Sequence, residues 1–190
     1  MNYEILHIGH PSLRELACEV SAEKIVTTEF QKFLDDLIAT MREANGAGLA
    51  APQIGESVQV FVVEVKDNPR YPYKPDIPLT VVINPVLEFL TPERYDNLEG
   101  CLSVPGLRGS VPRCPLIRLT FLGREGTERV LEARGISAGT FQHEFDHLQG
   151  TLFVDRVVDP TSFCTWEMYD KFHETRCRRV AEAVIQKFGG

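Results

Sequence analysis

The sequence predicts an α+β domain, with strands in its middle and helices toward both ends. Apolar residues recur at helical spacing between residues 28 and 42, β-branched and apolar runs follow between residues 59 and 134, and an amphipathic pattern starts at Ser162. The 190 residues suit one domain, or one domain with a terminal appendage.

The first long helix is predicted over residues 28–42, where one buried apolar stripe indicates a core-packing helix without chemistry. Thr28 and Gln31 can form a capping box at its start. The segment 45–48, Asn-Gly-Ala-Gly, is expected to end it, because glycine adopts the backbone angles of a C-terminal turn.

Four strands follow from β-branched and apolar composition. They cover residues 59–65 and 79–84, and a hairpin of 116–122 with 128–134. The intervening residues 66–78 contain four prolines, so we expect an irregular surface loop there.

A short helix over residues 139–149, closed by Gly150, carries two histidines four positions apart. His143 and His147 therefore lie on one helix face, where both rings can reach a single metal ion. Glu144 lies close to that ion without ligating it, which suits a base acting on metal-bound water. Catalytic metal sites usually take three protein ligands, so one ligand is missing from this helix.

The third ligand can come from either side of this helix. The downstream candidates belong to an amphipathic pattern: Glu167, Asp170, His173 and Glu174. The upstream candidate is Cys101 in the segment Glu99-Gly100-Cys101-Leu102-Ser103, where glycine permits close backbone approach and Glu99 adds a carboxylate. The other cysteines are interpreted as small buried apolar residues: Cys18, Cys114, Cys164 and Cys177.

Composition argues against several other classes. A net charge of −7 disfavours attraction to nucleic acid or anionic lipid, and no apolar run approaches the roughly 18 residues that span a bilayer. The N-terminus lacks the pattern of a signal or transit peptide. Five cysteines without a paired C-x-x-C spacing favour a reducing compartment. We therefore expect a cytoplasmic location.

Three separated segments together resemble the signature of peptide deformylases. They are residues 46–53 (GAGLAAPQ), 99–103 (EGCLS) and 142–148 (QHEFDHL). The opening Ile5-Leu6 and the segment 11–14 (PSLR) are also similar to the start of that family, so the likeness extends from about residue 3 to about 158. Three motifs in the same order and spacing are far more specific than one.

The resemblance implies antiparallel sheets packed around a central metal-binding helix. It implies that Cys101, His143 and His147 bind one divalent metal ion, with Fe²⁺ in the active form and Zn²⁺, Ni²⁺ or Co²⁺ as alternatives. The implied reaction is hydrolysis of the N-formyl group from the N-terminal formylmethionine of nascent polypeptides, with release of formate.

The same resemblance assigns the catalytic roles. Glu144 is the general base, and the Gln53 side-chain amide and the Leu102 backbone N–H donate to the oxyanion. Glu99 is expected to pair with a basic residue such as Arg108, which fixes the Cys101 turn. Asp146 is expected to contact Arg113 or another cation, or to be a solvated or structural carboxylate.

Substrate contacts are implied at Ala47, Gly48, Ile136, Gly139 and Thr140. Because Ala47 and Gly139 are smaller than the branched residues frequent at those places, we expect a roomier methionine pocket. The alternative is that a neighbouring side chain fills the space. The 66–78 segment is either part of the cleft rim or a plain surface loop.

Residues 1–160 are predicted to form the catalytic domain, and residues 161–190 a helical tail of the same domain. The resemblance implies that such a helix can dock on the ribosome, and the excess of basic over acidic residues in this tail permits contact with RNA. The other interpretation, which the sequence favours, is a solvated helix face. No membrane or sequence-specific nucleic-acid partner is expected. Two other functions remain open, a zinc endopeptidase and a deformylase-derived protein without activity.

Overall fold

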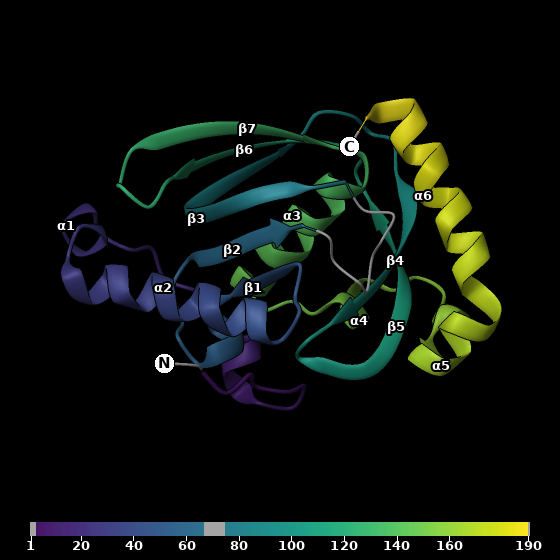
Figure 1. Cartoon of the computed structure of the whole chain (residues 1–190), viewed down its shortest axis with the longest axis horizontal. Helices are drawn as coiled ribbons and strands as arrows, with labels where there is room; N and C mark the ends of the chain where they lie inside the picture. The colour runs from purple at the N-terminus through teal and green to yellow at the C-terminus, as the bar shows by residue number, and fades with distance from the viewer. Residues whose placement is uncertain (1–2, 67–74, 190) are drawn as a thin grey trace.

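A computed structural model describes residues 3–66 and 75–189 of the chain. Figure 1 shows its helices and strands. The helices are α1 (Ala22–Ile25), α2 (Thr28–Glu43), α3 (Gly135–Leu148), α4 (Phe153–Arg156), α5 (Trp166–Met168) and α6 (Glu174–Phe188). The strands are β1 (Gly48–Ala50), β2 (Val60–Val65), β3 (Ile77–Phe89), β4 (Tyr95–Cys101), β5 (Val104–Arg113), β6 (Leu116–Leu122), β7 (Glu128–Arg134) and β8 (Cys164–Thr165). Short turns of other helix types are η1 (Pro11–Arg14), η2 (Ala51–Ile54), η3 (Pro160–Ser162) and η4 (Tyr169–His173).

The strands form two sheets in which every pairing between strands is antiparallel. One has the order β1-β2-β3-β6-β7 and the other the order β4-β5-β8. Helix α3 lies in the interior of the molecule, and α6 runs along the side that carries β4 and β5 (Figure 1). The predicted α+β architecture, with a helix toward each end of the chain, is confirmed.

Strand β2 shows why the central sheet is buried on both faces. Val60 and Val62 face the apolar stripe of α2, whereas Phe61 and Val63 belong to the core cluster that includes Phe141 of α3. A strand covered on both faces gains by being apolar at every position, which accounts for the continuous apolar run in the sequence. The sheet therefore holds α3 in a fixed position.

Helix α2 forms where it was predicted, but its two ends differ in detail. The N-cap is Thr27, whose side chain accepts a hydrogen bond from the Phe30 N–H, so the predicted capping box of Thr28 and Gln31 is wrong. At the other end Asn45, not a glycine, takes a positive φ of 51°. The Gly46 N–H then bonds to the Met41 carbonyl and closes the helix.

Strand β3 is longer than the predicted strand over residues 79–84. It starts at Ile77, so Pro78 belongs to a strand, next to a register shift in the pairing with β2. It continues past Asn84, where its pairing with β6 has a second register shift, between Ile83 and Val86. Irregular positions tolerate a proline because its missing N–H is not needed for the ladder. Residues 67–74 of the predicted loop lie outside the described residues.

The hairpin of β6 and β7 has the predicted bounds. Helix α3 begins at Gly135, four residues before its predicted start, and Gly150 follows its end with a positive φ of 65°. The C-terminal helix is interrupted, since β8, α5 and η4 precede α6. No helix in the described part of the chain is both long and apolar enough to cross a membrane.

Candidate metal centre and active site

Three side chains from two distant parts of the sequence converge in the interior. The Cys101 sulfur and one ring nitrogen each of His143 and His147 lie within 4.8 Å of one another. The Cys101 Sγ to His147 Nε2 distance is 3.4 Å. Ligands bound at about 2.3 Å (sulfur) and about 2.1 Å (nitrogen) to a tetrahedral ion stand roughly 3.6 Å apart. The three donors therefore fit a single metal ion, and no other such group of three is found in residues 3–66 and 75–189.

The fold explains this convergence. His143 and His147 occupy successive turns of α3, and Cys101 is the last residue of β4, before the Leu102-Ser103 turn into β5. The predicted compact turn is thus the tip of a hairpin. None of the downstream candidates Glu167, Asp170, His173 and Glu174 belongs to the cluster, so the endopeptidase-type ligand arrangement is wrong.

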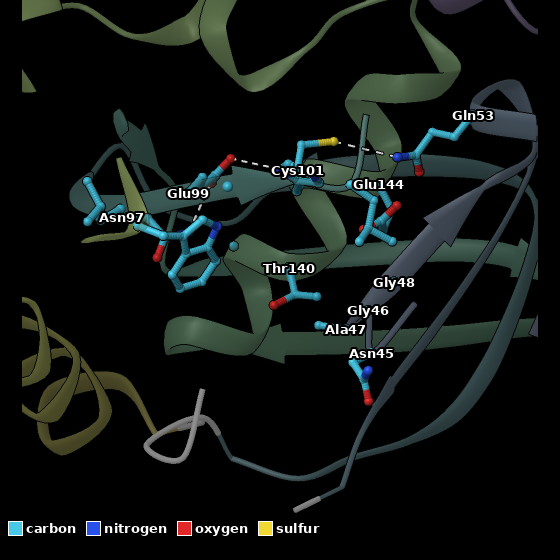
Figure 2. Close-up of a pocket in the computed structure, with 16 residues that line it drawn as sticks. Asn45, Gly46, Ala47, Gly48, Gln53, Asn97, Glu99, Cys101, Thr140 and Glu144 are labelled. Atoms are coloured by element: carbon cyan, nitrogen blue, oxygen red, sulfur yellow. Dashed lines mark hydrogen bonds and ion pairs between the residues drawn. The ribbon is translucent and has the colours of Figure 1, made fainter. Parts of the chain in front are cut away.

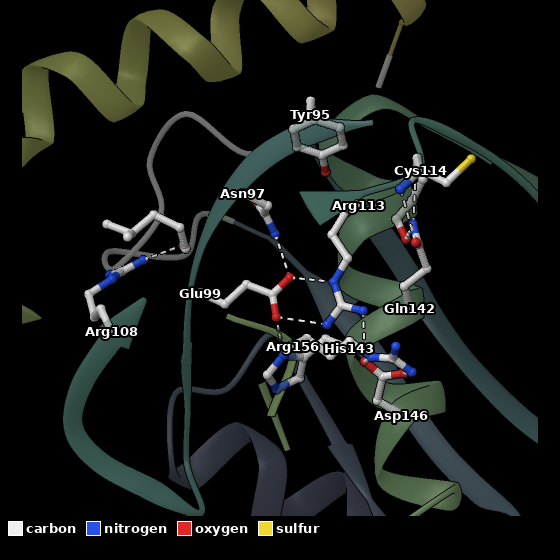
Figure 3. A network of polar contacts seen from close by, with 12 residues as sticks. Tyr95, Asn97, Glu99, Arg108, Arg113, Cys114, Gln142, His143, Asp146 and Arg156 are labelled. Carbon is white, nitrogen blue, oxygen red and sulfur yellow. Dashed lines mark hydrogen bonds and ion pairs between the residues drawn. The ribbon is translucent and has the colours of Figure 1, made fainter. Parts of the chain in front are cut away.

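Behind the candidate metal ligands, buried charges of alternating sign connect β4, β5 and α3, and the exposed Arg156 of α4 joins them at one end (Figure 3). Glu99 accepts from His143 Nδ1 at 2.9 Å and from Arg113 Nε and Nη2 at 2.7 and 2.9 Å. Arg113 Nη1 donates to Asp146 at 2.7 Å, and Asp146 also accepts two hydrogen bonds from Arg156. This buried charge row orients His143, since a ring nitrogen held by a carboxylate leaves the other free for a metal.

Two predictions about this row have different outcomes. The contact of Asp146 with Arg113 is confirmed. The expected pairing of Glu99 with Arg108 is wrong, because the cation that binds Glu99 is Arg113. Arg108 instead donates to the Leu98 carbonyl at 3.0 Å and lies fully buried against aromatic rings.

The protonation of the centre follows from burial and from this row. Burial alone raises the pKa of Glu99, but the Arg113 guanidinium and the hydrogen bonds from Arg113 and His143 hold that pKa well below its usual range. Burial lowers the pKa of His147, and the neighbouring His143 lowers it further. Burial also disfavours the charged form of His143, yet hydrogen bonds to Cys101 and Glu99 raise its pKa. The lowered pKa of His147 favours its neutral ring, the form in which an imidazole binds a metal.

Replacing Arg113 by alanine tests the contribution of the buried charge row to stability. The variant leaves Glu99 without its guanidinium, and breaking a buried ion pair typically costs about 3–5 kcal/mol. We expect a loss of that size in the free energy of unfolding, measured with denaturant on the metal-loaded protein. The surface variant Arg118→Ala loses only exposed pairs with Glu88 and Glu132, which solvent screens, so its stability should stay close to that of the parent. Equal losses in the two variants would contradict the assignment.

A cleft opens onto the metal cluster (Figure 2). Its walls come from the segment after α2, from β4 and the turn after it, from α3 and from the C-terminal segment. The lining residues are Asn45, Gly46, Ala47, Gly48, Gln53, Asn97, Leu98, Glu99, Gly100, Cys101, Leu102, Gly139, Thr140, His143, Glu144 and Trp166. Nearly all residues predicted from the sequence therefore surround one cavity.

Glu144 and Gln53 both line the cleft, and they come from α3 and η2. Glu144 is only 4% exposed, and a Cβ at Gly48 would lie 2.6 Å from its Cδ, so only glycine leaves room for this carboxylate. The Gln53 oxygen accepts from the Ala50 N–H at 2.8 Å. Its Nε2 therefore points at Ser103 and at the Cys101 sulfur, 3.1 and 3.5 Å away (Figure 2). The hydrogen bond from Ala50 therefore keeps the Gln53 amide N–H directed at the Cys101 side of the cleft.

Ile136 is the predicted pocket residue that the cleft does not contain. Its side chain is buried with Tyr95 against Ala181 and Val184 of α6. Helix α6 covers the first turn of α3. The Ile136 side chain therefore packs against α6 and does not line the methionine pocket that the resemblance implied. Arg108 likewise lies beneath the cleft wall rather than in it.

The space beside Gly139 is already filled. A Cβ at this position would lie 2.5 Å from the Tyr95 hydroxyl and 3.0 Å from the Asn97 amide nitrogen. The Tyr95 hydroxyl donates to the Gly135 carbonyl, and burial together with the Glu99 charge raises its pKa. The roomier pocket expected from a small residue here is therefore wrong at Gly139, and the alternative of a neighbouring side chain holds.

Asn97 and Trp166 line the cleft but were not predicted. Asn97, Glu99 and Cys101 alternate along β4, so they lie on one side of the strand, and Asn97 donates to Glu99 at 2.9 Å. Recognising a strand over residues 95–101 would have identified Asn97. No local pattern identifies Trp166, because its position depends on how the C-terminal segment packs.

The chain is similar in sequence to known proteins. Residues 2–162 match the polypeptide deformylase family. Peptide deformylase 2 of Nostoc sp. is 42% identical over 167 residues, which cover 88% of this chain and 92% of that protein. Peptide deformylase 1 of Bordetella pertussis is 45% identical over 163 residues, 86% of this chain and 92% of that protein.

The chain is also similar to solved structures. The Met-Ala-Ser-bound class I type b peptide deformylase of Acinetobacter baumannii has a TM-score of 0.80 at 36% identity, covering 83% of this chain and 99% of its own. The peptide deformylase of Synechococcus elongatus in complex with actinonin has a TM-score of 0.74 at 30% identity, covering 97% and 85%. The chain therefore belongs to the peptide deformylases, the hydrolases that remove the N-formyl group from nascent polypeptides.

Proposed function

We propose that Cys101, His143 and His147 hold the divalent metal ion of this deformylase, and that Glu144 is its general base. The observation that carries the proposal is the convergence of one sulfur and two imidazoles within 4.8 Å beside a buried glutamate. When bound, the metal supplies Lewis acidity, which makes water a competent nucleophile near neutral pH.

The side chains around it carry the proton and the developing charge. Glu144 takes a proton from the attacking water as the new C–O bond forms at the formyl carbon. It then gives that proton to the amine nitrogen as the C–N bond breaks, so that formate and a free N-terminus leave. The Gln53 amide and the Leu102 backbone N–H donate to the oxyanion, and donors of this kind are worth about 3–4 kcal/mol each.

The substrate peptide is proposed to lie between β1 and β4. Within the described residues β1 pairs only with β2, and β4 only with β5, so each strand has an open edge. An extended peptide can bond to such edges through its main chain. Gly48 lies at the start of β1, and Ala47, Gly139 and Thr140 border the same cleft, which suits binding of the formylmethionine.

Formate release from formyl-Met-Ala-Ser tests the proposed reaction. The metal-loaded protein should release one formate per peptide and leave the Met-Ala-Ser chain intact. Internal cleavage would instead favour an endopeptidase, and no turnover would favour a binding protein. We propose Fe²⁺ as the active ion, with Zn²⁺, Ni²⁺ or Co²⁺ as alternatives that the same thiolate and imidazoles accept. Anaerobic purification with elemental analysis identifies the ion.

The filled space beside Gly139 predicts selectivity for methionine over phenylalanine. Because the Tyr95 hydroxyl and the Asn97 amide close off that side, an aromatic ring should fit poorly. We expect kcat/KM for formyl-Met-Ala-Ser to exceed that for formyl-Phe-Ala-Ser by about tenfold or more. Equal values for the two peptides would show that the pocket extends elsewhere.

We also propose that residues 161–190 belong to the catalytic domain and that α6 contacts the ribosome. The inner face of α6 is buried, whereas Arg176, Arg178 and Arg179 lie on its exposed side. Salt-sensitive cosedimentation with ribosomes, lost when these three arginines are replaced, would support this contact. A cytoplasmic location is proposed because the five cysteines are free thiols.

A further inference from the structure

The C-terminal segment reaches the catalytic cleft. Strand β8 pairs with β5 so that Cys164 lies opposite Arg108, and Trp166 follows directly and lines the cleft. The segment that matches the family ends at residue 162, so Trp166 belongs to a part of the chain that follows this segment.

Trp166 is held in place by a buried cation. The Arg108 guanidinium carbon lies 4.2 Å from the centre of the Trp166 ring and 4.3 Å from the centre of the Tyr169 ring. Arg108 is completely buried and donates to the Leu98 carbonyl of β4. The two rings stand edge to face, 5.9 Å apart, and the guanidinium packs against both of them. Because it is also bonded to a strand, it fixes the indole relative to that strand.

The indole lies beside the residue that precedes the metal-ligating cysteine. Gly100 is the cross-strand partner of Arg108, and a Cβ on it would lie 4.0 Å from Trp166 Cζ2. Side chains of an extended peptide alternate between the two faces of a sheet. A peptide on the open edge of β4, with its formyl group at Cys101, therefore presents one of its later side chains on the face where Trp166 lies.

We propose that Trp166 is a specificity-determining residue, whose indole contacts a side chain downstream of the formylmethionine and favours an apolar one there. Arg108 is its positioning residue. The inference rests on the proposed function for the direction of the peptide. It gives the C-terminal segment a role in the cleft that is independent of any ribosome contact.

Trp166 is the only tryptophan of the chain, so its fluorescence reports on the cleft without turnover. The metal-loaded protein is titrated with Met-Leu-Ser and, separately, with methionine amide, which ends before the proposed contact. We expect a saturable change in tryptophan emission with the tripeptide and little change with the amide. Saturable tripeptide binding without any change in emission would overturn the proposal.

Kinetics of Trp166→Ala give the second readout. We expect KM for formyl-Met-Leu-Ser to rise roughly three- to tenfold, the range of an aromatic contact, with kcat nearly unchanged. Formyl-methionine amide should be hydrolysed as by the parent protein, and Trp166→Phe should restore most of the loss. The control is Phe172→Ala, which removes an exposed aromatic residue of the same segment, 64% exposed and outside the cleft.

Three kinetic outcomes would contradict the proposal. An equal loss on both substrates, or a fall in kcat alone, would mean that Trp166 acts by supporting the fold. Unchanged kinetics on both would mean that no substrate side chain reaches it. If the parent protein releases no formate, the proposed function fails, and the tripeptide titration still decides whether Trp166 lines a peptide site.

Discussion

Replacing Glu144 by alanine is expected to lower kcat by roughly 10²–10⁴-fold, the range attributed to a positioned general acid or base. The carboxylate is buried beside Gly48 on the helix that carries both histidines, so no other described acidic side chain of the cleft except the ion-paired Glu99 can replace it. Formate release from formyl-Met-Ala-Ser measures the effect.

The comparison requires equal metal content, because Glu144 lies between two proposed ligands in the sequence. Elemental analysis of each preparation provides this control. Glu144→Gln keeps the shape of the side chain without its basicity and should lose nearly as much, whereas the exposed Glu128→Ala should match the parent. Retained turnover in Glu144→Ala at full metal content would disprove the assignment of the general base.

Replacing Cys101 by alanine is expected to abolish stable metal binding. Two imidazoles then remain where a catalytic site needs three protein ligands. The affinity should fall by more than the roughly 10–100-fold that follows from losing a hydrogen-bonded partner of a ligand. Metal content after dialysis and formate release should both drop to near background.

A second cysteine provides the matched control for this experiment. Cys18 is exposed and lies outside the cluster, so Cys18→Ala should retain one metal ion per chain and full activity. Because both variants remove one thiol, nonspecific metal binding by thiols lowers both signals equally. A Cys101→Ala protein that keeps its metal would mean that the third ligand lies elsewhere.

The elements that the sequence predicted well are those with a local pattern. Alternating apolar residues gave the β6–β7 hairpin with its observed bounds, and helical spacing gave most of α2. The histidine pair could be placed on one helix face from spacing alone. These features depend on neighbours a few residues apart, which is the information that a single sequence contains.

The hairpin of β4 and β5 could not be predicted in this way, because its buried residues include charged ones. Glu99, Arg108 and Arg113 are 5%, 0% and 3% exposed, although such side chains normally indicate the surface. They are buried as partners of one another or of aromatic rings, and those partners are distant in sequence. The same holds for Ile136 and Trp166, whose surroundings are set by α6 and the segment before it.

The packing of the C-terminal segment against β5 and α3 also affects how the protein can be shortened. A chain ending at residue 162, where the family likeness stops, would lack β8, α5 and α6. The Arg108 guanidinium and the apolar surface of Tyr95 and Ile136 would then face water. Such a truncated protein would expose an apolar surface next to its catalytic cleft, and surfaces of this kind promote aggregation. A stable form of this enzyme therefore needs residues beyond the segment that matches the family.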